Sequence, residues 1–299
     1  MMREYEYTGK AMGTEFSIAI ISDSEELANS LATKAEAKIH AYEKQFSRFL
    51  PESELSQLNT QKDAIVSENF LAVVQEAYSL YQETEGIFNP LVQIERLGYT
   101  TSFDTLDSPQ KFESEEPYTI DFSKTLIEPT SRRIVLQEGQ KLDFGGFLKG
   151  YLAQILSIEI ERSSPLVTGA IVNIGGDIHA RGLDAQSAQF VFQIYNPLTK
   201  ESNLAVPLFN ASLATSGTYK RTWENDGAKT HHILDATGTQ NPDTDIVSAS
   251  VIHPKGSTAE AYAKVFLSLG EKKAMRILQN KDLAYVLIKN NGEIITHLS

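Results

Sequence analysis

Helix-like and strand-like segments follow one another in mixed order along this chain of 299 residues, and this order constrains the fold more than any other feature. A long amphipathic pattern over residues 23–49 predicts a helix that begins at Asp23 or Ser24. Short apolar or alternating runs elsewhere predict strands. The regular β–α–β alternation that is typical of a parallel sheet is missing. We therefore expect an α+β fold, with mixed sheets and packed helices.

Capping residues predict where several other helices begin and end. Ser53 and Ser67 each precede a helical pattern, and the second of these helices should stop near Gly86. The stretch "STAEAYAKVFLSLG" has a capping serine at Ser257 and a terminal Gly270, so it predicts another helix.

Glycine and polar segments predict the connections. Gly13 should join two strands near the start, and Asn291-Gly292 should form the turn of a hairpin near the end. Residues 100–140 are rich in Ser, Thr, Glu and Pro, and they predict a surface connection or a small hairpin. We expect residues 1–299 to form a single domain.

The charge and cysteine content exclude several classes of function. The chain has 27 basic and 39 acidic side chains, a formal charge of −12, which argues against a nucleic-acid or acidic-membrane partner. There is no cysteine, so thiol catalysis and zinc–thiolate sites are excluded. No stretch has the ~20 apolar residues of a membrane span, and the first residues lack the pattern of an export signal. We expect a cytoplasmic protein.

The segment "LDFGGFLKG", residues 142–150, is the strongest indication of a binding site. Asp143 precedes two glycines, and Lys149 falls in the first turn of the helix that follows. Free amide groups, the positive end of the helix and an ammonium group would together favour an anion. A plain strand-to-helix turn with a solvated lysine explains the same pattern, so both interpretations remain open.

Three other segments combine glycine with polar side chains. "VNIGGDI", residues 172–178, favours a tight hairpin. Thr215 and Ser216 in "ATSGTYKR" could either bind phosphate or close a turn. In "THHILDATG" the adjacent His231 and His232 lie on opposite faces of a predicted strand, and one of them is either a base or a structural residue.

Taken in order, these segments resemble the ApbE family, the FAD:protein FMN transferases. The resemblance spans residues 11 to about 270 and is carried by "AMGTEFSI", "FSRFLPESELSQLN", "EGIFNPLV", "LDFGGFLKGY", "VNIGGDI", "SLATSGTYKR", "HHILDATG" and "AEAYAKVFLSLG". It implies two similar halves with an FAD cleft between them. It also implies transfer of FMN from FAD to a Ser or Thr hydroxyl of a target flavoprotein, with Mg²⁺ as cofactor and AMP as the released product.

The resemblance also implies roles for individual residues. The flavin and adenine pockets would be lined by Met12, Phe49, Ile87, Phe88 and Asn89, with Ile233 beside the flavin. The nucleotide and its phosphates would be held by Asp143, Lys149, Thr215, Ser216 and Gly217. His232 would take the proton of the attacking hydroxyl or water, and Lys149 would assist at the phosphates. The carbonyl of Gly146 would be one metal ligand.

The sequence departs from the family at the remaining metal positions. The family helix reads Ala-Asp-Ala-x-Ala-Thr, and its Asp and Thr bind Mg²⁺; here these positions are Glu260 and Lys264. A protonated lysine has no lone pair to give to a metal. The pair is either an ordinary i,i+4 surface ion pair or an ammonium group that occupies or crowds the metal position. The second interpretation leaves two functions open: a transferase that works by metal-assisted phosphoryl transfer, and a flavin-binding or weakly FAD-hydrolysing family member.

Overall fold

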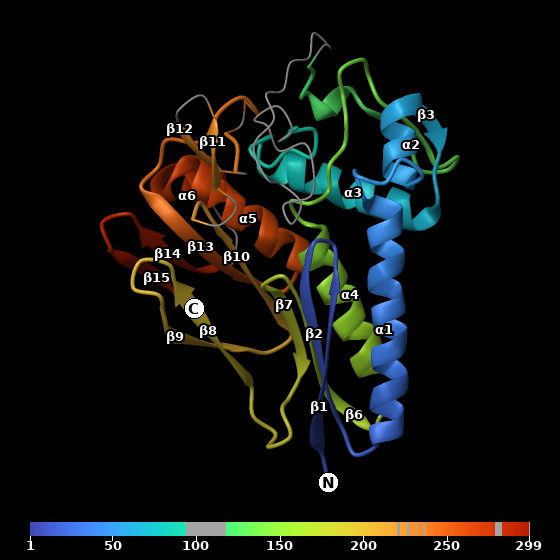
Figure 1. The fold of residues 1–299 in the computed structure, drawn as a ribbon, viewed down its shortest axis with the longest axis vertical. Coiled ribbons are helices and arrows are strands. Elements are labelled where there is room, and N and C mark those ends of the chain that lie inside the picture. Colours follow the sequence, from blue (N-terminus) through green and yellow to red (C-terminus); the bar gives the residue numbers. More distant parts are fainter. Residues whose placement is uncertain are drawn as a thin grey trace.

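The computed structural model describes residues 1–93, 118–219, 222–225, 228–231, 233–235, 237–278 and 283–298. Its centre is a sheet of eight antiparallel strands (Figure 1). In spatial order these strands are β1 (Arg3–Ala11), β2 (Thr14–Ser22), β6 (Val167–Ile174), β7 (Asp177–Gly182), β10 (Ala211–Gly217), β13 (Ile246–His253), β14 (Ala284–Lys289) and β15 (Ile294–His297). The predicted α+β class is confirmed, and every pairing between described strands is antiparallel rather than mixed.

Helices cover one face of this sheet and enclose the main apolar core. The helices are α1 (Glu25–Phe46), α2 (Glu54–Gln61), α3 (Glu68–Glu83), α4 (Leu148–Arg162), α5 (Gly256–Leu269) and α6 (Glu271–Ile277). Helix α4 packs on β6 and β7, and α5 packs on β10 and β13. Their apolar side chains bury one continuous cluster with strand residues such as Ile18, Val172 and Ala249. This burial stabilises the fold by about 25 cal/mol per Å² of apolar surface.

The opposite face of the sheet carries a separate hairpin. Strands β8 (Phe190–Asn196) and β9 (Glu201–Leu208) pair with each other and place Phe190 and Val206 against Leu213 of β10. Because side chains alternate across a strand, β10 contributes Leu213 to this second cluster and Ala214 to the main core. The alternation determines which face of the sheet each residue of β10 occupies.

Two small sheets lie outside the central one. Strands β3 (Asp63–Ile65), β4 (Leu126–Glu128) and β5 (Arg133–Val135) form one of them, and β11 (Thr222–Asn225) pairs with β12 (Ala228–His231) in the other. A 3₁₀ turn, η3 (Phe122–Lys124), precedes β4. For residues 118–140 the predicted small hairpin is confirmed by β4 and β5. The part of that prediction on residues 100–117 lies outside the described residues.

The capping serines were predicted correctly in three helices. Ser24 precedes α1 and its hydroxyl accepts from the Leu27 amide at 3.2 Å, and Ser53 and Ser67 cap α2 and α3 in the same way. The prediction for α5 was wrong by two residues, because its N-cap is Lys255. The Ser257 hydroxyl instead donates to the Glu76 carboxylate of α3, a contact that local sequence does not reveal.

Turn chemistry was also predicted correctly. The β1–β2 turn has positive φ at Met12 (54°) and Gly13 (65°), as a two-residue hairpin turn of type I′ requires. Gly270 ends α5 with φ of 72°, and the Asn291-Gly292 turn joins β14 to β15.

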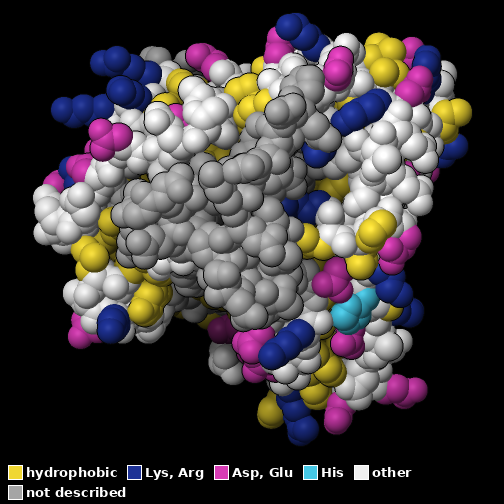
Figure 2. Space-filling view, turned by 45° about the horizontal axis from the view of Figure 1, so that its top comes forward, with side chains coloured by type: hydrophobic (Ala, Val, Ile, Leu, Met, Phe, Trp, Pro, Cys, Tyr) yellow, Lys and Arg dark blue, Asp and Glu magenta, His cyan; other side chains and the backbone are white. Residues whose placement is uncertain are grey.

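The surface carries interspersed charges. Acidic and basic side chains alternate over the described part of the face shown in Figure 2. Among the described residues, none of the helices combines the length and the apolar character that a membrane span requires.

Two glycines let α4 and α5 approach each other closely. A Cβ atom added to Gly150 would lie 2.4 Å from the Gly256 carbonyl oxygen, and one added to Gly256 would lie 2.0 Å from the Gly150 carbonyl oxygen. No side chain fits in this space, so any larger residue would force the helices apart. The N-terminal turns of the two helices, and the side chains they carry, are thereby brought together.

Gly256→Ala should destabilise the protein by about 1–3 kcal/mol through overpacking. In an open helix the same change would stabilise by about 0.5–1 kcal/mol, so the sign of the effect tests the close approach. Urea unfolding followed by circular dichroism measures it. Ser30→Ala on the exposed face of α1 is the control and should change stability by less than about 0.5 kcal/mol. An unchanged or raised stability in Gly256→Ala would contradict the predicted clash.

Candidate functional site

Turns and helix ends from both halves of the chain meet at one end of the sheet. The β6–β7 turn lies beside the β1–β2 turn, because the Gly175 amide donates to the Glu15 carbonyl at 3.0 Å. Asp177 follows that turn, and the first turns of α4 and α5 face it through Lys149 and Glu260. The site is therefore built from segments far apart in the sequence.

Four charged side chains form a cluster there: Lys149, Asp177, Glu260 and Lys264. The Lys149 ammonium contacts Asp177 Oδ2 and lies 2.8 Å from Glu260 Oε1. The Lys264 ammonium lies 3.2 Å from the same Glu260 oxygen. Two carboxylates and two ammonium groups cancel each other formally, so this charge cluster is neutral.

Glu260 occupies the anion position that the sequence predicted at the start of α4. The Gly150 amide, in the first turn of α4, donates to Glu260 Oε2 at 3.0 Å. The Glu260 side chain is 1% exposed, and both of its oxygens have donors. A buried carboxylate needs such partners, because the loss of its hydration is otherwise very costly. The positive end of α4 is therefore used to hold a residue of the protein itself.

The environment separates the pKa values of the two carboxyl groups. Burial would raise the pKa of Glu260, but the ammonium groups of Lys149 and Lys264 outweigh this and lower it to about 2. Burial and the neighbouring Glu260 charge raise the pKa of Asp177 to about 6, against the opposing effect of Lys149. Glu260 thus stays ionised at neutral pH, and Asp177 is the first carboxyl of the cluster to take up a proton in acid.

Burial also acts on the two lysines, with opposite outcomes. It would lower the pKa of Lys149, but the Asp177 and Glu260 carboxylates more than compensate and raise that pKa. For Lys264 burial prevails over the attraction of Glu260, and its pKa is lowered.

The described residues do not offer Mg²⁺ a suitable set of ligands. Within them, no group of three or more His, Cys, Asp or Glu side chains is arranged to hold a metal ion. Mg²⁺ requires near-octahedral oxygen ligands at about 2.0–2.1 Å, whereas both Glu260 oxygens already accept hydrogen bonds and Lys264 brings a positive charge. A divalent ion beside Glu260 would have to displace an ammonium group first.

Gly146 and Lys264, two of the three predicted metal positions, are brought together. A Cβ atom on Gly146 would lie 3.0 Å from the Phe88 ring and 3.7 Å from the Lys264 Cε atom. The stem of Lys264 therefore runs along the glycine turn at 142–150. The glycine turn and α5 therefore meet at this point.

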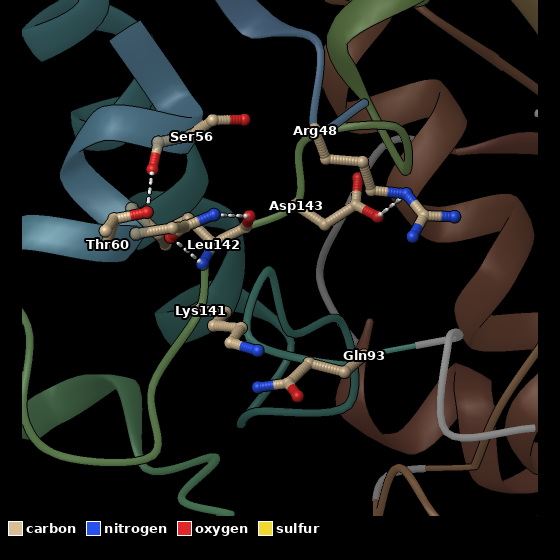
Figure 3. Close-up of a pocket in the computed structure, with 8 residues that line it drawn as sticks. Arg48, Ser56, Thr60, Gln93, Lys141, Leu142 and Asp143 are labelled. Carbon is tan, nitrogen blue, oxygen red and sulfur yellow. Dashed lines mark hydrogen bonds and ion pairs between the residues drawn. The ribbon is translucent and has the colours of Figure 1, made fainter. Parts of the chain in front are cut away.

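A polar pocket of about 190 Å³ opens beside Asp143 (Figure 3). Its lining comes from the loops after α1 and α3, from α2 and from the start of the glycine turn: Arg48, Ser56, Asn59, Thr60, Gln93, Lys141, Leu142 and Asp143. Asp143 accepts the Gly145 amide at 2.8 Å and lies 3.3 Å from the Arg48 guanidinium. Arg48 also covers the ring of Phe49, which is 43% exposed. Arg48 thus contacts both Asp143 and Phe49, two of the predicted site residues.

The predicted residues of the 87–89 segment divide into apolar and structural roles. Phe88 is buried and its ring lies 5.8 Å from that of Phe147, while Ile87 packs against the core. The Asn89 amide is used within the loop, because it donates to the Ile120 carbonyl at 2.7 Å and accepts from the Leu91 amide at 3.0 Å.

The predicted phosphate segment lies on both faces of the sheet. Thr215 faces away from α4 and α5 and its hydroxyl lies 2.8 Å from that of Ser250, whereas Ser216 shares its face with Ala214 and the helices. At Gly217 a Cβ atom would meet the Tyr219 ring at 2.2 Å. Thr215 is therefore separated from the charge cluster by the sheet itself.

The histidine segment is described only in part. Ile233 is buried in the main core, and its carbonyl accepts from the Asn241 amide group at 2.7 Å. His232 lies outside the described residues.

Asp177 and Arg48 are site residues that the sequence reasoning did not select. Asp177 stands in "VNIGGDI", which was interpreted as a hairpin, and that hairpin is present as β6 and β7. The aspartate after the two glycines was the available signal, because a carboxylate at the tip of a buried hairpin needs a partner. Arg48 lies in "FSRFLPESELSQLN", one of the segments that carry the family resemblance.

The amino-acid sequence matches one family of known proteins. The model of the ApbE family matches residues 12–287, so this chain belongs to the ApbE family. Curated relatives include a protein of Klebsiella pneumoniae that is 25% identical over 98% of this chain and 92% of its own length. Another, from Treponema pallidum, is 28% identical over 76% of this chain and 68% of its own length. Both are named FAD:protein FMN transferase.

Solved structures share the same fold. The ApbE protein of Thermotoga maritima superposes with a TM-score of 0.85 at 23% identity, covering 98% of this chain and 97% of that one. The flavin transferase ApbE of Vibrio cholerae has a TM-score of 0.79 at 21% identity, covering 99% and 97%. The ApbE-like α+β fold is thereby established.

Lys149→Met should destabilise the protein by about 3–5 kcal/mol, because it removes the ion-pair partner of the buried Asp177 and leaves the buried Glu260 with Lys264 alone. Lys38→Met is the matched control. Its exposed ion pair with Glu159, at 2.6 Å, should contribute less than about 1 kcal/mol. Equal losses in the two variants, measured by urea unfolding, would contradict a structural role for Lys149.

His179 gives a pH-dependent prediction. It is 1% exposed on β7, and burial together with the nearby Arg181 charge lowers its pKa to about 4. The unfolded chain therefore binds one more proton between about pH 6.5 and 4, and stability is lost as the pH falls through this window. As the pH falls through this window, the free energy of unfolding of wild type should decrease by up to about 3 kcal/mol relative to that of His179→Gln. Asp177, whose pKa is raised, changes stability in the opposite direction over this window. It is present in both proteins, so its contribution cancels when their free energies of unfolding are subtracted. A constant difference over this window would refute a neutral His179.

Proposed function

We propose that this chain is an FAD:protein FMN transferase, which moves FMN from FAD to a Ser or Thr hydroxyl of a target flavoprotein and releases AMP. Membership of the ApbE family and the names of its relatives support this function. The observation that carries it is the meeting of the glycine turn with α5, with 2.8 Å between Lys149 and Glu260. This end of the sheet is where the proposed diphosphate would bind.

In the proposed reaction the acceptor hydroxyl oxygen attacks the FMN-side phosphorus in line. The new P–O bond joins FMN to the acceptor, and the bond from that phosphorus to the bridging oxygen breaks. AMP leaves with the bridging oxygen, and the hydroxyl proton goes to a base, for which we propose His232. Positioning and charge stabilisation account for most of the catalysis in such transfers. We assign no step to a metal, because the donor atoms around Glu260 are already used.

The charge cluster would hold the diphosphate in place rather than react with it. Lys149 is fixed between two carboxylates, so its ammonium cannot move freely. Fixed charges need little reorganisation when charge develops on the phosphoryl oxygens. Arg48 and Asp143 would orient the nucleotide at the neighbouring polar pocket. Met12 at the β1–β2 turn is partly buried and offers apolar surface for a ring system, while the buried Phe88 supports the glycine turn from within the core.

A second candidate function is flavin binding with weak FAD hydrolysis or none. The ion pair between Lys264 and Glu260 favours it, because this pair occupies two positions that bind the metal in the family pattern. Such a protein would keep intact FAD and release little AMP.

Purified protein incubated with FAD, a flavoprotein acceptor domain and Mg²⁺ should release AMP and label the acceptor covalently with FMN. AMP is measured by chromatography and the acceptor label by its fluorescence after denaturation. Intact FAD on an unmodified acceptor would instead support the flavin-binding alternative.

Glu260→Asp with Lys264→Thr should raise the Mg²⁺-dependent turnover by at least about 10-fold, because it restores oxygen ligands for the ion. AMP release measured with and without EDTA checks this. A wild type that is already fast, with no gain in the double variant, would show that these two residues do not limit the reaction.

A further inference from the structure

One ammonium group of the charge cluster is placed differently from the other. Lys149 lies between two carboxylates, whereas among the residues that the structure describes Lys264 has only the Glu260 carboxylate within ion-pair distance. Its ammonium lies 3.2 Å from Glu260 Oε1 and 3.5 Å from the Glu260 carbonyl oxygen. The Lys264 side chain is 21% exposed, against 1% for Glu260.

We propose that this chain binds the diphosphate of its dinucleotide without a divalent metal, because the Lys264 ammonium takes the place of the ion as a permanent counter-charge. The proposal rests on the FAD site proposed above and deepens it. It concerns binding, so it applies to a transferase and to a flavin-binding protein alike.

The position of Lys264 supports this role. Its stem passes the glycine turn at 142–150, where a Cβ atom on residue 146 would lie 3.7 Å from the Cε atom of Lys264, a normal van der Waals contact. An ammonium with three donors and two long contacts can still donate to a phosphate oxygen.

The balance of charges supports it as well. The cluster is already neutral, with two carboxylates against two ammonium groups. A divalent ion beside Glu260 would add two positive charges next to Lys149 and Lys264, where both Glu260 oxygens already accept hydrogen bonds. A diphosphate arriving without a metal meets no net negative charge there, and it meets one ammonium that faces partly outward. The arrangement therefore favours the bare dinucleotide over its metal complex.

Lys149 cannot take over this role. Its ammonium is held by Asp177 and Glu260 together and its side chain is 16% exposed, so moving it toward a ligand would take the ion-pair partner from the buried Asp177 and one of two ammonium groups from Glu260. Lys264 can turn toward a phosphate while Glu260 keeps Lys149 and the Gly150 amide as donors. The two lysines thus have separate tasks, one structural and one directed at the ligand.

The test is the dissociation constant for FAD, measured by isothermal titration calorimetry in EDTA and in excess Mg²⁺. Wild type should bind FAD with the same affinity, within about 2-fold, under both conditions. Lys264→Met should weaken binding about 10- to 100-fold in EDTA, as expected for the loss of a charged hydrogen bond. Lys264→Arg should restore most of it. Lys264→Thr should bind weakly in EDTA and recover when Mg²⁺ is added.

Lys289→Met is the matched control, because it also removes one lysine from an i,i+4 ion pair, with Glu293 on the far edge of the sheet. It should leave FAD binding unchanged. Circular dichroism and thermal unfolding identify any variant that does not fold, and the wild-type comparison of EDTA with Mg²⁺ needs no variant.

Two results would overturn the proposal: a wild type that binds FAD only with Mg²⁺, or a folded Lys264→Met that binds as tightly as wild type in EDTA. A wild type that binds no FAD under either condition would overturn the proposed function itself, and the inference with it. If wild type binds FAD tightly but only with Mg²⁺, the proposal of metal-free binding fails while the proposed function stands.

Discussion

The site depends on one buried carboxylate. Glu260 is almost fully enclosed, and such a group is stable only when every oxygen has a donor. Lys149 supplies one donor and the Gly150 amide another, so Glu260 ties α5 to the first turn of α4. Asp177 joins β7 to the same point through Lys149. Two helices and a strand are therefore held in one arrangement by electrostatics that would be weak on the surface.

Close packing makes this arrangement possible. The Gly150–Gly256 approach places the backbones of α4 and α5 so near each other that a carboxylate on one can reach an amide on the other. Packing and charge thus act together: the two glycines allow the short distance between the helices, and Glu260 forms its hydrogen bond across that distance. The consequence is that the charged groups of the cluster are held in one arrangement by the protein itself.

Local sequence predicted most of the secondary structure, for reasons that are themselves local. The hydroxyls of Ser24, Ser53 and Ser67 cap helices by accepting from the amide three residues further on, and Gly13 and Gly292 adopt the positive φ of their turns. The exception at α5 has a physical cause. Ser257 could have capped this helix, but its hydroxyl donates a hydrogen bond to the carboxylate of Glu76, which is 181 positions away in the chain.

By itself the sequence determined the α+β class, the ends of most helices, and two segments with the residues of an anion site, because these follow from periodicity and capping within a few positions. Only the tertiary structure decided how the site's charges are paired. The choice of Glu260 as the anion at the start of α4, and of Asp177 as the second partner of Lys149, depends on contacts 110 and 28 positions apart. Such contacts arise from helix packing and sheet order, which no short stretch of sequence encodes.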